Sequence, residues 1–300
     1  MPILGPTHHA IGLARKAAQG DELRLWALAN DNRSAERSIT LKTINVAIVL
    51  VLCMFSGAAF TQTREDKCAP DIYEAAKRHL KVSEFAPRQD GGNVISAACR
   101  IWPYKTNLLL AAFAYDEGVE YEKQLVVLIL DHKKRYVISG YRRDIAEDAV
   151  TEVGEYSLKL DTARYQLAEG VRAFGIRFNS SANGANCGDG YWSDELTLFV
   201  AERKKLRPVL SLNLSQQRWL RGCPTATAGA LWEDALLTIG TADTITNGFR
   251  DLVVNAKITV NSEGAPNGDH KDHIERHTLH YDGKTYKKGQ SVSWWLTQGG

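Results

Sequence analysis

Four of the eight histidines lie close together, in the segment DHKDHIERHTLH that ends at His280. On a helix, His270, His273 and His277 would share one face, because residues three and four apart are neighbours there. Three imidazoles are a known zinc ligand set, and a zinc-bound water can serve a metal-dependent hydrolase. The order is not the H-E-x-x-H of zinc proteases, and an extended strand would place His277 beside core residues instead. The cluster therefore predicts either a zinc site or solvated histidines that lead into a hairpin.

A second candidate metal site is DTITNGFRDLVV, residues 243–254. Calcium loops place oxygen ligands at alternating positions around a tight glycine turn. The segment resembles the calcium loop of FG-GAP or integrin-type propeller repeats, and this resemblance implies calcium ligands at Asp243, Asn247 and Asp251. Ile245 departs from the pattern because it has no oxygen to offer. The alternative is a glycine turn that leads into a buried strand.

The longest loop rich in glycine and asparagine is NSSANGANCGDGYW, which ends at Trp192. Loops on a rigid β scaffold commonly carry recognition, and aromatic side chains anchor protein partners. Asn183, Tyr191 and Trp192 are therefore candidate binding residues. In the alternative interpretation, Cys187 fastens the loop through a disulfide and the tryptophan packs in the core.

Several common function classes find no support in the chain. The sequence contains no G-x-S-x-G, no P-loop and no dinucleotide-binding fingerprint, so no catalytic residue is assigned. Residues 1–59 carry six of the 37 basic and four of the 35 acidic residues, which leaves 31 of each in the remainder. A neutral chain argues against nucleic acid or an anionic membrane surface as a partner, because both require a basic excess.

An export signal is predicted at an unusual position. Residues 41–59 contain a lysine, an apolar core and a small-x-small ending, which are the three parts of a signal peptide, and cleavage is expected before Phe60. In the alternative, residues 44–60 span the inner membrane as a single-pass anchor, and only then would the protein contact a membrane. Residues 1–40 are interpreted as an over-extended start of the reading frame or as a disordered tail.

Four cysteines remain after removal of the signal. An even number of cysteines in an oxidising compartment indicates disulfides, here two. Sequential pairing would close one loop within each half of the chain. The absence of any C-x-x-C argues against a zinc knuckle or a thioredoxin-type redox pair. The favoured bonds are Cys68–Cys99 and Cys187–Cys223.

The elements that would position these residues are one helix followed by many strands. Apolar residues recur at helical spacing over Asp71–Val82, within a lead-in and helix that cover 60–90. From residue 91 to 300, short β-rich runs alternate with turn residues, and about three repeats are expected in a single β-rich domain. The predicted fold is mainly β, with repeated antiparallel meanders arranged as propeller-like blades or a β-sandwich and one short N-terminal helix. The expected hairpins lie at 125–141, 196–212 and 277–286.

Three further segments suggest a wider likeness: CRIWP at 99–103, GFRDL at 248–252 and YDGKTY at 281–286. With them the chain resembles secreted bacterial β-rich proteins of unknown function, which implies export and a β-rich fold but no activity. We therefore expect a periplasmic or secreted binding or inhibitor module for another protein of the cell envelope. The alternatives are a metal-dependent hydrolase that uses the 270–277 histidines, and a membrane-anchored structural protein of the envelope.

Overall fold

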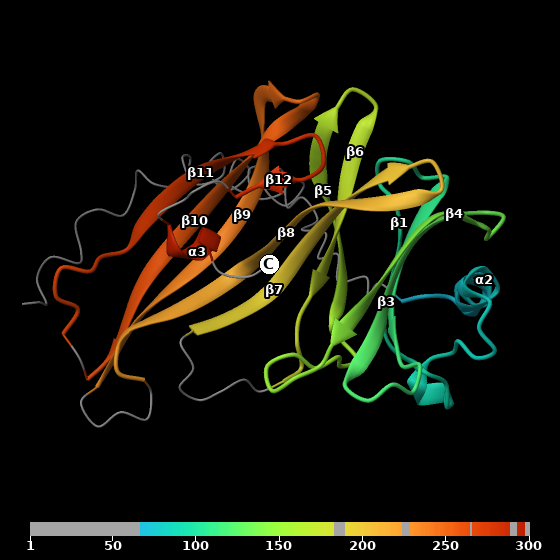
Figure 1. Ribbon diagram of the computed structural model, residues 1–300, viewed down its shortest axis with the longest axis horizontal. Coiled ribbons are helices and arrows are strands. Elements are labelled where there is room, and N and C mark those ends of the chain that lie inside the picture. The colour runs from blue at the N-terminus through green and yellow to red at the C-terminus, as the bar shows by residue number, and fades with distance from the viewer. Residues whose placement is uncertain (1–66, 183–189, 224–228, 265, 289–292, 298–300) are drawn as a thin grey trace, which may run out of the picture. The chain divides into compact units, whose positions relative to one another are not determined.

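Strands dominate the computed structural model, which describes residues 67–182, 190–223, 229–264, 266–288 and 293–297 (Figure 1). All of these residues belong to one unit, Arg64–Gly300. The elements are α2 (Pro70–Leu80), the 3-10 helix η1 (Arg88–Asp90), β1 (Val94–Ile101), β2 (Leu108–Tyr115), β3 (Glu122–Asp131), β4 (Val137–Ala146), β5 (Leu158–Ala168), β6 (Val171–Phe178), β7 (Gly190–Glu202), β8 (Lys205–Arg221), β9 (Ala230–Thr246), β10 (Phe249–Glu263), β11 (His273–Tyr281), β12 (Tyr286–Lys287) and α3 (Trp294–Thr297).

The strands follow one another as three antiparallel meanders of four strands each. Within β1–β4, β5–β8 and β9–β12, every strand pairs antiparallel with the next one along the chain. A single parallel bridge between Gly140 and Lys205 joins β4 to β8, and β8 pairs with β9. All twelve strands therefore belong to one sheet. The predicted fold class, mainly β with repeated antiparallel meanders and one short helix near the start, is confirmed.

The helix α2 forms where the apolar spacing predicts it. Pro70 occupies the first turn, where a missing N–H costs nothing, and Lys81 ends the helix in the left-handed conformation at φ 58°. Ile72, Ala75 and Ala76 are buried on the face that meets the sheet. The helix shares this core with apolar residues of β1, β2 and β3. Burial of apolar surface between the helix and these strands stabilises α2.

A disulfide joins Cys68, just ahead of α2, to Cys99 in β1. This bond is one of the two predicted from the sequence, and it is confirmed. Cys223 is disulfide-bonded as well. Its predicted partner Cys187 lies outside the described residues, as do the predicted segments 1–40 and 41–59.

Two separate hydrophobic cores pack against opposite faces of β7. In β7, Leu196 and Leu198 contact one buried cluster, whereas Phe199 belongs to a second cluster with Phe174 and residues of β1–β3. Alternate residues of a strand point to opposite faces, so this mainly apolar run, Leu196–Val200, is buried on both sides. The run is flanked by longer, more polar stretches of β7–β10 that are buried on one side alone.

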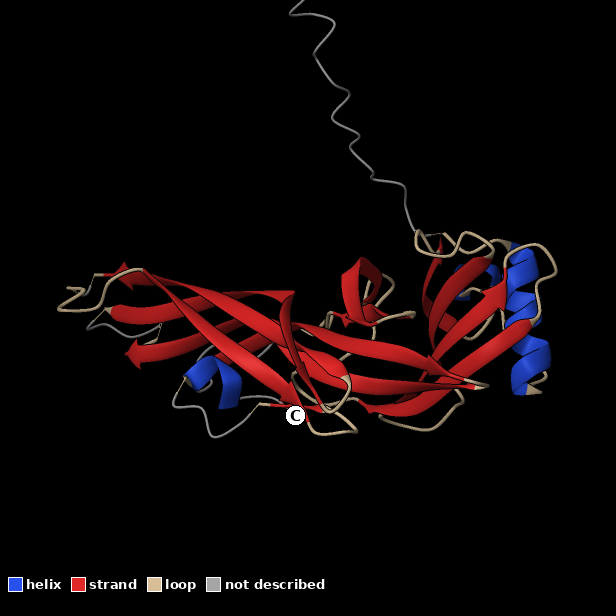
Figure 2. Ribbon diagram, turned by 90° about the horizontal axis from the view of Figure 1, so that it is seen from above, coloured by secondary structure: helices blue, strands red, loops and turns tan. Residues whose placement is uncertain are grey.

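The short helix α3 covers one face of the long strands (Figure 2). Trp295 is completely buried, and its indole Nε1 donates a hydrogen bond of 2.7 Å to Glu275 Oε2. Gln216 Nε2 donates to the Trp295 carbonyl oxygen, also at 2.7 Å. Four residues are too few to form a helix alone, so packing on the sheet and these hydrogen bonds keep α3 folded. No helix in the described ranges is both long enough and apolar enough to cross a membrane.

Candidate binding face

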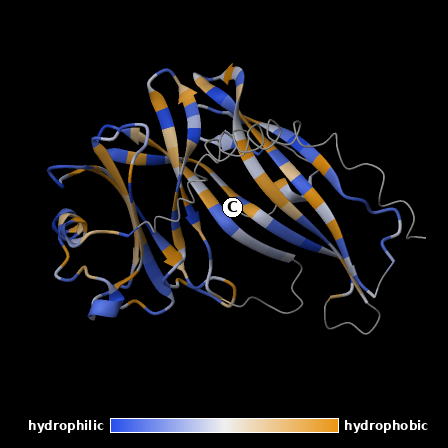
Figure 3. Ribbon diagram, turned by 180° about the vertical axis from the view of Figure 1, so that it is seen from behind, coloured by the Kyte–Doolittle hydropathy of each residue, from blue (hydrophilic) through white to orange (hydrophobic). Residues whose placement is uncertain are grey.

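The long strands β7–β11 present two faces with different surroundings. Hydrophobic and hydrophilic residues alternate along several of these strands (Figure 3). We call the face under α3, which contains Gln216, Ala235 and Ile258, the inner face, and all three of these side chains are buried. The opposite side is called the outer face. The direct sequence neighbours of the inner-face residues belong to the outer face, because successive side chains of a strand point to opposite sides of a sheet.

The outer face consists of rows of side chains that run across the strands, about 4.8 Å apart from strand to strand. The pairing register fixes their order, since residues directly opposite one another in antiparallel strands share a face. The rows are Trp219–Trp232–Asn261, then Tyr191–Gln217–Asp234–Thr259, then Ser193–Ser215–Leu236–Lys257–Ile274.

Large apolar side chains stand in solvent on this face. The exposed fractions are 46% for Tyr191, 55% for Leu236 and 75% for Ile274. Trp219 and Trp232 are partly buried and pack against each other with ring centroids 5.5 Å apart. Single exposed apolar residues are ordinary, but several within one continuous face of a sheet mark an interaction surface.

Hydrogen bonds order the polar residues between these apolar ones. Asp234 Oδ1 accepts from Gln217 Nε2 at 2.9 Å, and Asp234 Oδ2 accepts from Asn261 Nδ2 at 2.8 Å. One carboxylate therefore fixes a side chain on each neighbouring strand. The side chains lose less conformational freedom on binding when they are already held, so the outer face is preorganised for contact with a partner.

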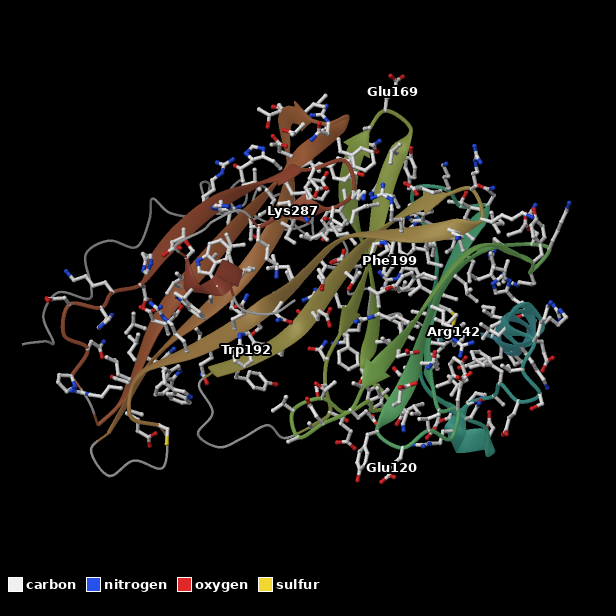
Figure 4. All side chains as sticks on the ribbon, in the orientation of Figure 1. Glu120, Arg142, Glu169, Trp192, Phe199 and Lys287 are labelled. Carbon is white, nitrogen blue, oxygen red and sulfur yellow. A yellow bond between two sulfur atoms is a disulfide. The ribbon has the colours of Figure 1, made fainter. Side chains whose placement is uncertain are left out.

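The structure separates the residues that the sequence suggests for binding. Tyr191 lies opposite Gln217 on the outer face, whereas Trp192 lies opposite Gln216 on the inner face. Trp192 is near the start of β7 (Figure 4) and is 39% exposed. Asn183, the third residue of that prediction, lies outside the described residues. Of the predicted binding residues in the described ranges, Tyr191 alone belongs to the outer face.

The histidines of the predicted zinc site are distributed along an extended segment rather than a helix. His273 and His277 belong to β11, and His270 precedes it. His270 Nδ1 lies 3.7 Å from the buried carboxylate of Glu233, which also accepts hydrogen bonds from Arg218. No group of three or more histidine, cysteine, aspartate or glutamate side chains in the described ranges could hold a metal ion.

His273 takes part in the contacts that hold the C-terminal helix. Its Nε2 lies 3.2 Å from Glu275 Oε1, and its Nδ1 lies 2.9 Å from the Lys271 carbonyl oxygen. The bond to that carbonyl, followed by the bond to Glu275, raises the pKa of His273 above its usual 6.5. Burial alone would raise the pKa of Glu275, but hydrogen bonds from Ser293, Trp295 and His273 lower it below its usual 4.5.

These two pKa shifts predict a window of greatest stability for the α3 contacts. The contribution of His273 is fully present below pH 6.5 and is lost as pH rises through its raised pKa, whereas that of Glu275 is lost as pH falls through its lowered pKa. His273 is nearly half exposed, so we expect His273→Gln to cost about 0.5 kcal/mol at pH 6 and nothing measurable at pH 9. Urea unfolding of both proteins across this range measures the difference. An equal loss at the two pH values would contradict the assignment.

The predicted calcium loop is the tip of the β9–β10 hairpin. Asn247 and Gly248 form its turn with φ of 49° and 88°, the left-handed values that a two-residue hairpin turn requires. Asp243 pairs with Arg250 at 3.1 Å, and the Asn247 side chain donates to the Tyr281 carbonyl oxygen at 2.8 Å. Two of the three predicted calcium ligands are therefore bonded to protein groups at this hairpin tip.

Asp251 is 1% exposed, and its Oδ2 accepts a hydrogen bond of 2.6 Å from the Thr244 hydroxyl. The same oxygen lies 3.1 Å from His280 Nδ1. Burial alone would raise the pKa of Asp251, but hydrogen bonds from Thr244, Thr246 and His280 lower it below its usual 3.8. The ionised carboxylate therefore fastens β9 and β11 on either side of β10.

A depression on the described surface has a volume of about 440 Å³ and is lined by residues of β1, β5 and β6, among them Arg100, Lys159 and Arg177. Arg177 forms an ion pair with Asp194, so part of this positive charge is already neutralised. The geometry that stands out is the apolar, hydrogen-bonded outer face.

Four apolar residues of the outer face were not predicted from the sequence: Trp219, Trp232, Leu236 and Ile274. For the three residues in β8 and β9, the signal is the mixture of polar and apolar residues along these strands, but such a pattern does not show which side is covered. The register and the position of α3 supply that information. Comparison of the chain with protein-family models, with curated proteins and with solved structures finds no match.

Proposed function

We propose that this protein is an exported binding module that engages another protein of the cell envelope through the outer face. The observation that carries the proposal is the exposure of Tyr191, Leu236 and Ile274 on one side of a hydrogen-bonded sheet. Exposed aromatic and aliphatic side chains of this kind supply most of the binding energy in protein interfaces. A rigid sheet lets them bind without first being ordered.

The form of the outer face favours a protein as the partner. It spans five strands, or about 19 Å, and its three rows cover about 13 Å along the strands. Small molecules bind in concave pockets that surround them, whereas protein interfaces of about 800 Å² on each partner are broad. The outer face would form the centre of such an interface. The balanced charge of the chain after residue 59 argues against nucleic acid.

The Cys68–Cys99 disulfide supports the exported location, because such bonds persist in oxidising compartments. The intact mass of the full-length protein, expressed in the envelope of a bacterial host, tests this part of the proposal. Loss of residues 1–59 is expected from the signal-peptide interpretation. A mass that retains them would favour the membrane-anchored alternative and would contradict release into the periplasm.

The binding role is tested with a double variant, Tyr191→Ala with Leu236→Ser. Wild-type protein and the variant are used to retain proteins from an envelope extract, and the retained partner is purified for affinity measurement. We expect the variant to bind at least tenfold more weakly, because two exposed apolar contacts are lost, about 1.4 kcal/mol or more.

The control is Tyr156→Ala with Val150→Ser, which removes one exposed aromatic and one exposed aliphatic side chain (77% and 53% exposed) between β4 and β5, outside the outer face. This control is expected to bind like wild type. Equal affinity of the outer-face variant and the wild type would overturn the proposal, as would the absence of any retained partner.

A further inference from the structure

The strand β11 forms an edge of the sheet that is largely open in the described part of the chain. On one side, β11 pairs with β10 from His273 to Leu279. On its other side, β12 pairs only with His280 and Tyr281. Unpaired N–H and C=O groups along a sheet edge are a template for another strand. The segment from His273 to Leu279 can therefore accept a strand from a second molecule.

We propose that two copies of the chain pair antiparallel through this edge, about a two-fold axis that passes through Ile274. Most soluble homo-oligomers are two-fold dimers in which the same surface of each copy meets itself. In an antiparallel pair about such an axis, residues equally distant from Ile274 lie opposite one another and share a face. Ile274 is 75% exposed and would contact its own copy.

Two pairs of opposite charge fall opposite one another in this register. Asp272, the residue before β11, would lie opposite Arg276 of the other copy, and His273 would lie opposite Glu275 on the inner face. Directly opposite side chains in antiparallel strands have Cβ atoms about 4.5–5.5 Å apart, so Asp272 and Arg276 would be within reach of each other, whereas His273 and Glu275 already bond within each copy. Each pair occurs twice because of the symmetry. A register centred on Glu275 or on Arg276 would place that charge against its own copy.

Arg276 is available for the pair with Asp272 of the second copy. Arg276 is exposed and has no ion-pair partner within the described ranges. Asp272 uses one oxygen, Oδ1, to accept a hydrogen bond of 2.8 Å from the Val260 backbone N–H of β10, which holds the carboxylate close to β10. No existing contact of Arg276 in the described ranges has to break when the second copy binds.

Pairing of this kind would join the sheets of two copies and leave both outer faces on the same side. A partner with two matching sites would then meet two binding faces at once, which raises the overall affinity without any new contact. The bivalent binding rests on the proposed function, whereas the dimer does not depend on the proposed function. An experiment can therefore overturn the dimer without overturning the binding of an envelope protein, and the reverse also holds.

The test is sedimentation velocity of the full-length protein between about 1 and 100 μM, a range that resolves the weak dimers formed by small interfaces. We expect a concentration-dependent dimer in the wild type. Asp272→Arg and Arg276→Asp should each weaken it at least tenfold, because each places like charges opposite one another twice. The double variant exchanges the two charges and should return to within about threefold of wild type. Lys257→Asp, on the outer face but two strands from the partner, should leave the dimer unchanged.

Asp272→Arg also removes the hydrogen bond to Val260, so thermal melting by circular dichroism establishes that each variant is folded. Ile274→Lys keeps that bond and brings two lysines together on the axis, and it should also abolish the dimer. A wild type that stays monomeric at about 100 μM overturns the proposal. So does a dimer that Ile274→Lys leaves intact, or one that the charge-exchanged double variant does not recover.

Discussion

Replacement of Cys68 and Cys99 together by alanine is expected to lower the free energy of unfolding by about 3–4 kcal/mol. The two cysteines are 31 residues apart in the sequence and are bonded in the structure. A bond that closes a loop of this length removes conformational freedom from the unfolded chain, which corresponds to about 3–4 kcal/mol at 25 °C. Cys99 is also buried within the core that α2 shares with β1–β3, so its removal leaves a small cavity.

Urea unfolding under non-oxidising and non-reducing conditions measures this loss. The single variant Cys68→Ala serves as the comparison, because it breaks the same bond while it keeps the buried Cys99 side chain. The two variants should be destabilised by similar amounts, with the small difference reporting the cavity. A double variant within about 1 kcal/mol of the wild type would contradict the prediction. Reduction of the wild type is less specific, because Cys223 is disulfide-bonded too.

The same bond links stability to compartment. Without it, α2 would depend on its buried residues Ile72, Ala75 and Ala76 and on the aromatic contact of Tyr73 with Phe113, whose ring centroids lie 5.3 Å apart. An eleven-residue helix has little stability of its own. We therefore expect this end of the protein to be less stable in a reducing cytosol, in agreement with the proposed export.

Local patterns in the sequence predicted the elements well. The predicted helix over Asp71–Val82 corresponds to α2, and the hairpins at 125–141, 196–212 and 277–286 correspond to β3–β4, β7–β8 and β11–β12. These features depend on residues close together in the chain, namely apolar spacing, turn residues and strand-forming side chains. One missed element is β1, whose residues 94–101 combine small and apolar side chains without clear alternation.

The assignment of faces could not be predicted, because it depends on contacts far apart in the sequence. The contact of α3 with Gln216 joins residues 79 positions apart, and this contact decides which side of β8 is covered. Once that side is known, the pleat assigns Tyr191 to solvent and Trp192 to the face under α3. From the sequence one can infer that the side chains of two adjacent strand residues point to opposite faces of the sheet. The sequence does not show which of the two faces is exposed.

The histidine cluster illustrates the same limit. Adjacent histidines suggest a shared metal, yet His270 meets Glu233 from β9 and His273 meets Glu275. Glu233 precedes His270 by almost forty residues, and nothing near it in the sequence marks it as a partner. The buried carboxylates have cationic or hydrogen-bonding neighbours because an unpaired buried charge is costly.

Replacement of Trp295 by alanine is the second change expected to have a large effect, a loss of about 3–5 kcal/mol in the free energy of unfolding. The side chain is fully buried on the inner face and donates to Glu275 through Nε1. Its removal leaves a large cavity and takes one hydrogen bond from a carboxylate that is two-thirds buried. The same measurement on Trp295→Phe should show a smaller loss, about 1–3 kcal/mol, because most of the volume remains and mainly the Nε1 hydrogen bond is lost.

Exposed Leu236 provides the contrast that makes this experiment informative. Leu236→Ser should change stability by less than about 0.5 kcal/mol, because the side chain is 55% exposed, yet it removes part of the outer face. Trp295→Ala should do the reverse, with a large loss of stability and unchanged partner affinity per folded molecule. If Leu236→Ser destabilised the protein as much as Trp295→Ala, the outer face would be part of the folded core. The expected result, in which Trp295→Ala lowers stability and Leu236→Ser lowers partner affinity, would assign stability to the inner face and recognition to the outer face of the same sheet.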